Sequence, residues 1–233
     1  MESRTAEMPF SADWEAVKWV TSKPRELFRS LPFEAEVSGE EPFDVQIRIR
    51  RRLFKFEFSG RMNVAFADST ATYVMKGPKG LLILSASVDG DVLLSRASAD
   101  LVERFLGRKL ETLVNGFALA VCRFSESYRR IVGKILPTGE GEFYVRELAS
   151  EDLPHLIRYL RFSIGDGTFS LRGKGNGEEF RIIVENDAVK SIEHESSGRS
   201  AIVEVNKPLL GVGEDDFSGL ELGGEYFLSV LRR

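Results

Sequence analysis

Residues 48–60, RIRRRLFKFEFSG, place five cationic side chains and three phenylalanines in thirteen positions. The apolar residues before the arginine run stand at odd positions and those after it at even positions: Val45, Ile47 and Ile49, then Phe54, Phe56 and Phe58. Successive side chains of a strand point to opposite faces, so this change of phase requires a turn or bulge, which we place at Arg51–Arg52. The stretch therefore predicts a β-hairpin.

The hairpin separates the aromatic residues from the cations. Basic residues interleaved with aromatics are typical of nucleic-acid surfaces, which need both on one face. Here the phenylalanines point together as core or pocket wall, whereas the basic residues lie at the tip or on the outer face. Nucleic acid is therefore disfavoured as a partner. The exposed arginines form a candidate patch for an acidic partner or an anionic membrane surface, with a solvated hairpin as the alternative: Arg48, Arg50, Arg51 and Arg52.

The composition of the chain is that of a globular protein with no bias toward polyanions. Its 233 residues are 42% apolar and 29% charged, with a net charge of −4. A lone Cys122 excludes an internal disulfide and fits a reducing cytosol. The sequence shows no signal-peptide pattern and no apolar run long enough to span a membrane. We therefore expect a cytoplasmic location, and the scarcity of glutamine (only Gln46) hints at a thermophilic source.

The region before the hairpin predicts a short strand and two short helices. Residues 4–12 suit a strand, and ADWEAVKWVTSKPRELFRSLP suits two helices broken at Lys23–Pro24. Asp13 or Ser11 can cap the first helix and Ser22 the second.

From residue 33 to residue 95 the apolar residues alternate with polar ones between regular turn signals. This pattern predicts an antiparallel meander of about six strands. The breaks are expected at five places: Ser38–Gly39, Gly60, Asp68–Ser69, Gly77–Gly80 and Asp89–Gly90.

A long amphipathic helix is expected to begin at Ser98–Asp100 and to reach about Arg123, with SESYRRIVGKIL as its continuation or as a second segment. Its apolar stripe recurs at helical spacing: Leu101, Phe105, Leu106, Leu110, Leu113, Val114, Phe117, Val121 and Phe124. Gly107 and Gly116 interrupt a good helix, so we expect a neighbouring backbone to approach closely there.

Pro137–Gly141 is the best candidate for a domain boundary. Beyond it, EDLPHLIRYLRF predicts a short helix, and strands separated by glycine-rich turns follow. GKGNG at 173–177 precedes a strand rather than a helix, which indicates a hairpin turn and not a phosphate loop. The predicted fold class is α+β, with domains at 1–137 and 138–233, the second a smaller α+β unit of no detected family.

The order of strand, two short helices, long meander and long helix resembles the helix-grip fold of the START-like superfamily, the SRPBCC type that includes polyketide cyclases. Within it, the nearest likeness is to the G-subunit family of carbon-monoxide-dehydrogenase proteins. The shared segments are Phe10–Ala12, Trp14–Val17, Leu27–Pro32 and Phe56–Arg61. The likeness covers about residues 4–124. It implies an N-terminal helix-grip domain in which a curved antiparallel sheet wraps a long C-terminal helix.

The resemblance further implies an apolar cavity between the sheet and the long helix, which family members use for lipids, sterols, quinones or polyketides. Small-molecule pockets are mostly apolar and lie at such positions. The candidate lining residues are Phe54, Phe56, Phe58, Val64, Phe66, Met75, Leu82 and Leu84 on the strands, and Leu106, Leu110, Val114 and Phe117 on the helix. The same stripe would also result if these side chains simply filled the core.

No motif in the chain nominates a metal, a cofactor or a nucleophile. His155 and His194 have no second ligand at metal-binding spacing, and Asp152 is best explained as a helix cap. Cys122 falls near the apolar stripe and is expected to be a buried, inert thiol. GEDDF at 213–217 lacks the alternating ligands of a calcium loop and is expected to form a solvated turn. We expect neither a cofactor nor a metal site.

Catalysis is not supported by the pattern, although a cyclase-type enzyme stays open. Some helix-grip enzymes place acid–base residues in the cavity, but alternation puts Glu57 opposite the phenylalanine face, and Arg61, Lys76 and Asp91 form no inward pair. The leading hypothesis is non-catalytic binding or carriage of a hydrophobic molecule such as a lipid, an isoprenoid or a quinone. The alternatives are a protein–protein adaptor with a filled core, in which both domains serve protein contacts and the C-terminal domain is a candidate partner site, and a cyclase-type enzyme.

Overall fold

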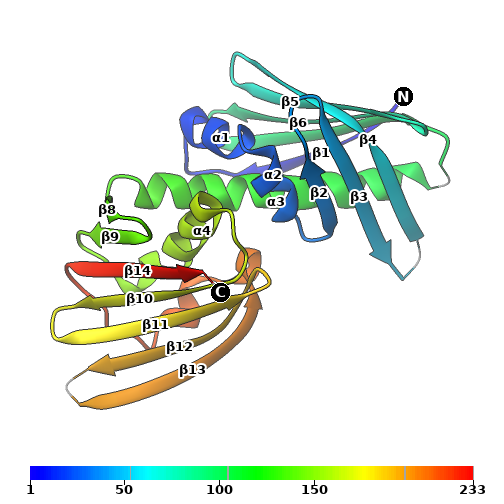
Figure 1. The fold of residues 1–233 in the computed structure, drawn as a ribbon. Coiled ribbons are helices and arrows are strands. Elements are labelled where there is room, and N and C mark those ends of the chain that lie inside the picture. The colour runs from blue at the N-terminus through cyan, green and yellow to red at the C-terminus, as the bar shows by residue number, and fades with distance from the viewer. Residues whose placement is uncertain (53, 104, 197, 233) are drawn as a thin grey trace. The chain divides into compact units, whose positions relative to one another are not determined.

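The computed structural model describes residues 1–52, 54–103, 105–196 and 198–232. The chain forms two compact units, unit 1 (Met1–Glu126) and unit 2 (Ser127–Arg233). Each unit holds one antiparallel sheet of seven strands (Figure 1). The α+β fold class is confirmed.

Sheet A of unit 1 runs in the order β1-β7-β6-β5-β4-β3-β2. Its strands are β1 (Glu2–Pro9), β2 (Glu34–Ser38), β3 (Phe43–Arg51), β4 (Phe54–Ala67), β5 (Thr70–Gly77), β6 (Gly80–Asp89) and β7 (Val92–Leu101). Strands β2 to β7 form the predicted meander, and β1 pairs with β7 at the other edge. The long helix α3 (Leu106–Ile131) covers the sheet, which is the expected helix-grip arrangement.

The predicted change of phase across the arginine run is confirmed by the register of β3 and β4. Ile47 lies opposite Phe58 and Ile49 opposite Phe56, and all four side chains are buried. The strands separate after Arg51, so the turn lies close to its predicted place.

The two short helices are also present, with one of the predicted caps. Helix α1 (Trp14–Thr21) begins at Asp13, whose carboxylate accepts a hydrogen bond from the backbone N–H of Ala16. Helix α2 (Pro24–Arg29) begins after Lys23 and has no side-chain cap. The predicted capping by Ser22 is wrong, because its hydroxyl donates back to the carbonyl of Trp19.

The long helix begins later than predicted. Ser98, Ala99 and Asp100 belong to β7, which pairs with β1 on one side and β6 on the other. A Ser-x-Asp sequence resembles a helix start, but two ladders of hydrogen bonds outweigh a local capping preference. Phe105, expected in the apolar stripe, precedes α3 and is 70% exposed. The predicted continuation is confirmed for residues 125–131, where α3 runs without interruption to Ile131, whereas Ile135 and Leu136 of the same segment belong to a strand.

Two glycine expectations are corrected by the packing. Gly60 does not break β4: a Cβ there would lie 2.4 Å from the carbonyl oxygen of Lys76, so the glycine permits close pairing within the strand. In α3 the close neighbours are side chains rather than backbone. Gly107 faces Arg4 and Glu2, and Gly116 faces the Pro32–Phe33 segment.

Sheet B of unit 2 runs in the order β13-β12-β11-β10-β14-β9-β8. Its strands are β8 (Ile135–Gly139), β9 (Glu142–Val145), β10 (Phe169–Gly175), β11 (Glu178–Glu185), β12 (Ala188–Ser196), β13 (Arg199–Pro208) and β14 (Tyr226–Arg232). Helix α4 (Leu153–Ile164) follows the short helix η1 (Ser150–Asp152) and packs on one face of the sheet. Two further short helices, η2 (Leu209–Gly211) and η3 (Glu214–Phe217), complete the unit. The GKGNG segment forms the predicted β10–β11 hairpin.

The predicted boundary after Pro137 falls inside β8. The last residues of α3, from Ser127 to Ile131, belong to unit 2 by their contacts. The assignment of residues 1–137 to one domain and residues 138–233 to a second of no detected family stays a prediction.

Asp152 anchors the start of α4 rather than capping it. Its side chain is fully buried and accepts from Arg130 at 2.5 Å, from Lys134 at 2.7 Å and from the backbone N–H of Ala149. Burial opposes the charged form, but these hydrogen bonds outweigh it and lower the pKa of Asp152. The predicted capping of α4 is wrong because the carboxylate serves these three donors instead.

We expect Asp152→Asn to destabilise unit 2 by about 2–3 kcal/mol, since it removes a buried acceptor from two cations. Glu151→Gln is the matched control, because Glu151 also pairs with Arg130 but is exposed; it should cost less than about 1 kcal/mol. The change in unfolding free energy of each variant is measured by chemical denaturation, with amide hydrogen exchange as the readout for unit 2. Equal effects of the two variants would contradict the proposed anchor.

The Asp152 carboxylate also makes the free energy of unfolding depend on pH in the acid range. Because its folded-state pKa is lowered, ionised Asp152 stabilises the fold above the ordinary aspartate pKa of about 3.9. That contribution is lost as the pH falls through the lower folded value. The difference in unfolding free energy between wild type and Asp152→Asn should therefore be constant near neutrality and shrink in acid.

Candidate functional site

The layer between sheet A and α3 holds most of the residues predicted to line a cavity. The buried ones are Phe56, Phe58, Met75, Leu82, Leu84, Leu106, Leu110, Val114 and Phe117. Phe54 and Val64 are half-buried, and Phe66 is 41% exposed. Phe66 lies outside the layer because β3 begins opposite Met62, so the end of β4 extends past its neighbour.

Three aromatic rings occupy the middle of this layer. Tyr73 of β5 packs edge-on against Phe28 of α2 at 5.4 Å and against Phe117 of α3 at 5.8 Å between ring centroids. Its hydroxyl donates to the carbonyl of Thr21 at 2.5 Å. Burial raises the pKa of Tyr73, so the phenol is a neutral donor. Sequence reasoning missed Tyr73, although it shares the strand phase of Met75.

The layer is closed in this structure. Six of the predicted lining side chains have no accessible surface: Met75, Leu82, Leu84, Leu110, Val114 and Phe117. A side chain without accessible surface touches no space wide enough for a water molecule. These six residues therefore line no open cavity, and a ligand would have to displace side chains that now fill the layer.

Two buried hydroxyls have no hydrogen-bond partner within the described part of the chain: Ser95 Oγ of β7 and Ser125 Oγ of α3. Both side chains are fully buried. Alternation puts Ser95 on the same face of β7 as the buried Leu93 and Ala97. An unpaired buried hydroxyl costs free energy, so each such group requires a physical explanation.

The rest of the buried polar set in unit 1 is small. Among the described residues it comprises Thr21, Ser30, Ser98 and Lys109 besides the two unpaired serines. Lys109 pairs with Glu103 at 2.5 Å, a contact that contributes to lowering the pKa of this carboxyl against the opposing effect of burial. The polar residues considered for catalysis face outward: Arg61, Lys76 and Asp91 are exposed, and the Glu57 side chain is 43% exposed.

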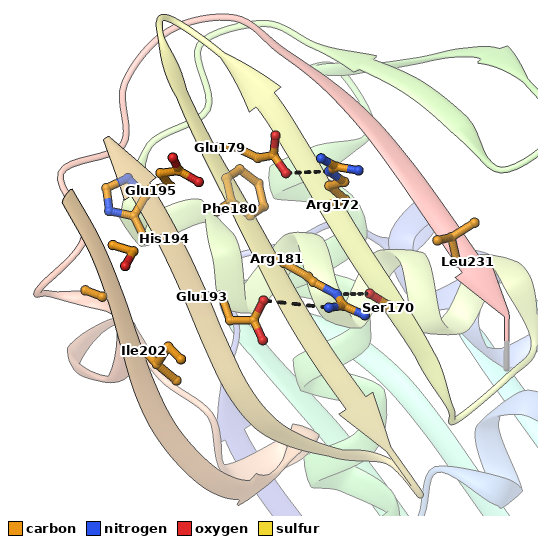
Figure 2. Close-up of a pocket in the computed structure, with 12 residues that line it drawn as sticks. Ser170, Arg172, Glu179, Phe180, Arg181, Glu193, His194, Glu195, Ile202 and Leu231 are labelled. Atoms are coloured by element: carbon orange, nitrogen blue, oxygen red, sulfur yellow. Dashed lines mark hydrogen bonds and ion pairs between the residues drawn. The ribbon is translucent and has the colours of Figure 1, made fainter. Parts of the chain in front are cut away.

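In unit 2 a groove of about 520 Å³ lies on the face of sheet B opposite α4 (Figure 2). Arg181 reaches Glu193 at 3.7 Å and Ser170 at 3.1 Å across it. Exposed apolar side chains also line this groove, with Leu231 60% and Ile202 71% exposed. A second groove of about 410 Å³ on the same sheet includes Phe227, which is 67% exposed and packs against Tyr144. The sequence pattern did not single out this face.

The histidines form local pairs rather than a metal site. His194 lies 2.9 Å from Glu178, which also accepts from the buried Tyr226 hydroxyl, and burial together with this bond raises the pKa of Tyr226. His155 lies 3.3 Å from the Ser127 hydroxyl. Among the described residues no group of three or more His, Cys, Asp or Glu side chains could hold a metal ion.

Other sequence expectations have mixed outcomes. Cys122 is buried, with its sulfur 3.7 Å from the carbonyl of Pro9. The GEDDF segment forms η3, in which Asp216 pairs with Lys207 while Phe217 is buried, so the turn is only partly solvated. Within the described chain, no helix is both long and apolar enough to cross a bilayer.

No protein-family model matches the chain, and no curated protein does either. Among solved structures, a protein from Thermus thermophilus is 13% identical, covers 54% of this chain and 98% of its own, and has a TM-score of 0.42. The di-domain ARO/CYC StfQ from the steffimycin biosynthetic pathway is 10% identical over 100% of this chain and 85% of its own, with a TM-score of 0.38. Major latex-like protein 151 from Panax ginseng is 10% identical over 55% of this chain and 96% of its own, again with a TM-score of 0.38. The topology described above defines an α+β protein with a helix-grip unit, and these distant likenesses add no function to it.

We expect Phe117→Ala to lower the unfolding free energy of unit 1 by about 3–5 kcal/mol, because the closed layer cannot fill the void. Phe66→Ala is the matched control, and its exposed ring should cost less than about 1 kcal/mol. Thermal or chemical unfolding of both variants measures the difference. Similar losses would show that the layer is looser than its burial indicates.

Proposed function

We propose that unit 1 binds or carries a hydrophobic small molecule, without catalysis, between sheet A and α3. The observation that carries the proposal is the pair of unpaired buried hydroxyls, Ser95 and Ser125, on the two elements that enclose an otherwise apolar layer. A ligand that is apolar along its length and bears one or two oxygen atoms would satisfy both the layer and the hydroxyls. A lipid, an isoprenoid or a quinone-like molecule has this chemistry.

Binding requires the closed layer to open. The aromatic cluster is tied to the α1–α2 segment by the hydrogen bond from Tyr73 to Thr21 and by the ring contact with Phe28. Movement of residues 14–29 would release both contacts and free the space that the rings now occupy. The affinity is then reduced by the fraction of molecules in the open state.

The proposed class agrees with the resemblance of residues 4–124 to the G-subunit family of carbon-monoxide-dehydrogenase proteins, which is itself a proposal. A cyclase-type enzyme is less well supported. The buried polar set of unit 1 contains no carboxylate or imidazole among the described residues, and acid–base catalysis needs such a group near the substrate. A cytoplasmic location stays a prediction from the single cysteine.

The direct test is to purify the protein, extract it with organic solvent and examine it by native mass spectrometry. We expect a bound apolar molecule, or saturable binding of a fluorescent fatty-acid or quinone probe. A folded protein that carries nothing and binds neither probe would overturn the proposal.

Serine variants test where the molecule lies. In the empty protein, Ser95→Ala and Ser125→Ala should each raise the unfolding free energy by about 1 kcal/mol, because they remove an unpaired buried hydroxyl. In the probe-bound protein the same variants should weaken binding about fivefold each, the worth of one hydrogen bond. Ser98→Ala is the control, since its side chain lies on the opposite face of β7. Unchanged probe affinity in both variants would place the ligand elsewhere.

An adaptor role is the second candidate, and the groove-bearing face of sheet B supports it. Phe227, Leu231 and Ile202 are exposed there beside arginine–carboxylate pairs, a composition typical of protein interfaces. If the protein binds no apolar molecule, this face becomes the better-supported site.

Replacing Phe227 and Leu231 by serine should then remove a co-purifying partner without unfolding unit 2.

A further inference from the structure

The hairpin of β3 and β4 ends in a concentration of positive charge. We define the cationic tip by Arg48, Arg50, Arg51, Arg52 and Lys55, all of which are exposed. The strands separate between Arg51 and Phe54, so the tip lies at one end of the hairpin (Figure 1). The buried pair Ile49 and Phe56 holds it to the core of unit 1.

Few of these charges are neutralised within the described chain. Arg48 lies 3.9 Å from Glu34 and Lys55 lies 2.9 Å from Glu57. Arg50, Arg51 and Arg52 form no ion pair with any residue that the structure describes. Unit 1 (Met1–Glu126) has 18 basic and 18 acidic residues, so its net charge is zero although its tip is strongly positive.

The arrangement is unfavourable for an isolated hairpin. Arg50 lies directly opposite Lys55, and like charges at opposed positions of an antiparallel pair destabilise it. The hydrogen bond from Lys55, reinforced by the charges of Arg48 and Lys79, lowers the pKa of Glu57. The tip is thus a local positive field that an external anion would relieve.

The shape of the tip selects among anionic partners. A nucleic-acid surface needs several exposed aromatic rings beside the cations, but Phe56 and Phe58 are only 1% and 2% exposed and Phe54 is half-buried. The cations also do not share one face: Arg48, Arg50 and Lys55 lie on the outer face, Arg51 has the opposite phase and Arg52 lies in the turn. Mobile headgroups can gather around such a tip from several sides, whereas a folded acidic protein presents a fixed surface.

We propose that the cationic tip docks the protein on an anionic phospholipid surface. The rest of the chain has a net charge of −9, because the whole chain has −4 and the tip has +5, so an anionic surface would favour approach by the tip. The docking uses residues outside the sheet–helix layer and does not depend on the proposed ligand. If that ligand is an apolar membrane component, the tip would bring unit 1 to its source.

The test measures binding to phosphatidylcholine vesicles with and without phosphatidylserine, by co-sedimentation. We expect binding only to the anionic vesicles, weakened by salt. The triple variant Arg50→Gln/Arg51→Gln/Arg52→Gln should lose roughly a hundredfold, about fivefold per cation. The control is Lys76→Gln/Arg108→Gln/Arg199→Gln, which removes the same charge from exposed residues elsewhere and should lose little.

Three results would overturn the proposal. The first is no binding of the wild type to anionic vesicles at low salt. The second is an equal loss in the tip and control variants, which would indicate a diffuse charge effect. The third is tip-dependent binding to single-stranded DNA or polyglutamate without binding to vesicles, which would assign the tip to another class of partner. Probe binding in solution, measured on the same variants, reports on the apolar layer separately.

Discussion

The main constraint on unit 1 is that side chains must fill the space between sheet A and α3. The sizes of the residues on the facing strands and on the helix depend on this packing. Three buried residues on this face of β7 are small, namely Ser95, Ala97 and Ala99, whereas Tyr73 and Phe117 are among the largest fully buried side chains. Protein interiors are close-packed, so side-chain size matches the local gap between sheet and helix. The aromatic cluster therefore fills the space in which we propose that a ligand binds.

The close packing between sheet A and α3 affects both the stability of unit 1 and its proposed function. An apolar layer closed by aromatic rings is stable without a ligand, which agrees with the zero exposure of Met75, Leu110 and Phe117. The unpaired hydroxyls of Ser95 on β7 and Ser125 on α3 cost free energy, because each is buried without a hydrogen-bond partner among the described residues. A molecule that supplies oxygen atoms and apolar surface would exchange the ring contacts for its own and remove that cost. The balance between these states would set the affinity.

Charge is arranged differently in the two units. In unit 2, Asp152 is buried and fully engaged with Arg130 and Lys134, so its charge serves the fold. In unit 1, the cations at the end of the β3–β4 hairpin contribute nothing comparable to packing, and Arg50 faces Lys55. Charges that stabilise no internal contact are available to a partner, because neutralising them from outside costs no native interaction.

Local periodicity determined much of this protein from the sequence alone. Alternation predicted the β3–β4 hairpin and its change of phase, and helical spacing predicted α3 and its apolar stripe, because both patterns follow from backbone geometry. Only the tertiary structure decided that Ser98–Asp100 extend β7, that Asp152 binds two cations and that Phe66 is exposed. Those outcomes depend on which neighbours a residue meets. The tertiary structure also decided whether the layer between sheet A and α3 is open or filled. Periodicity predicts the face on which a side chain lies, but it does not predict the volume of the space between that face and the next element.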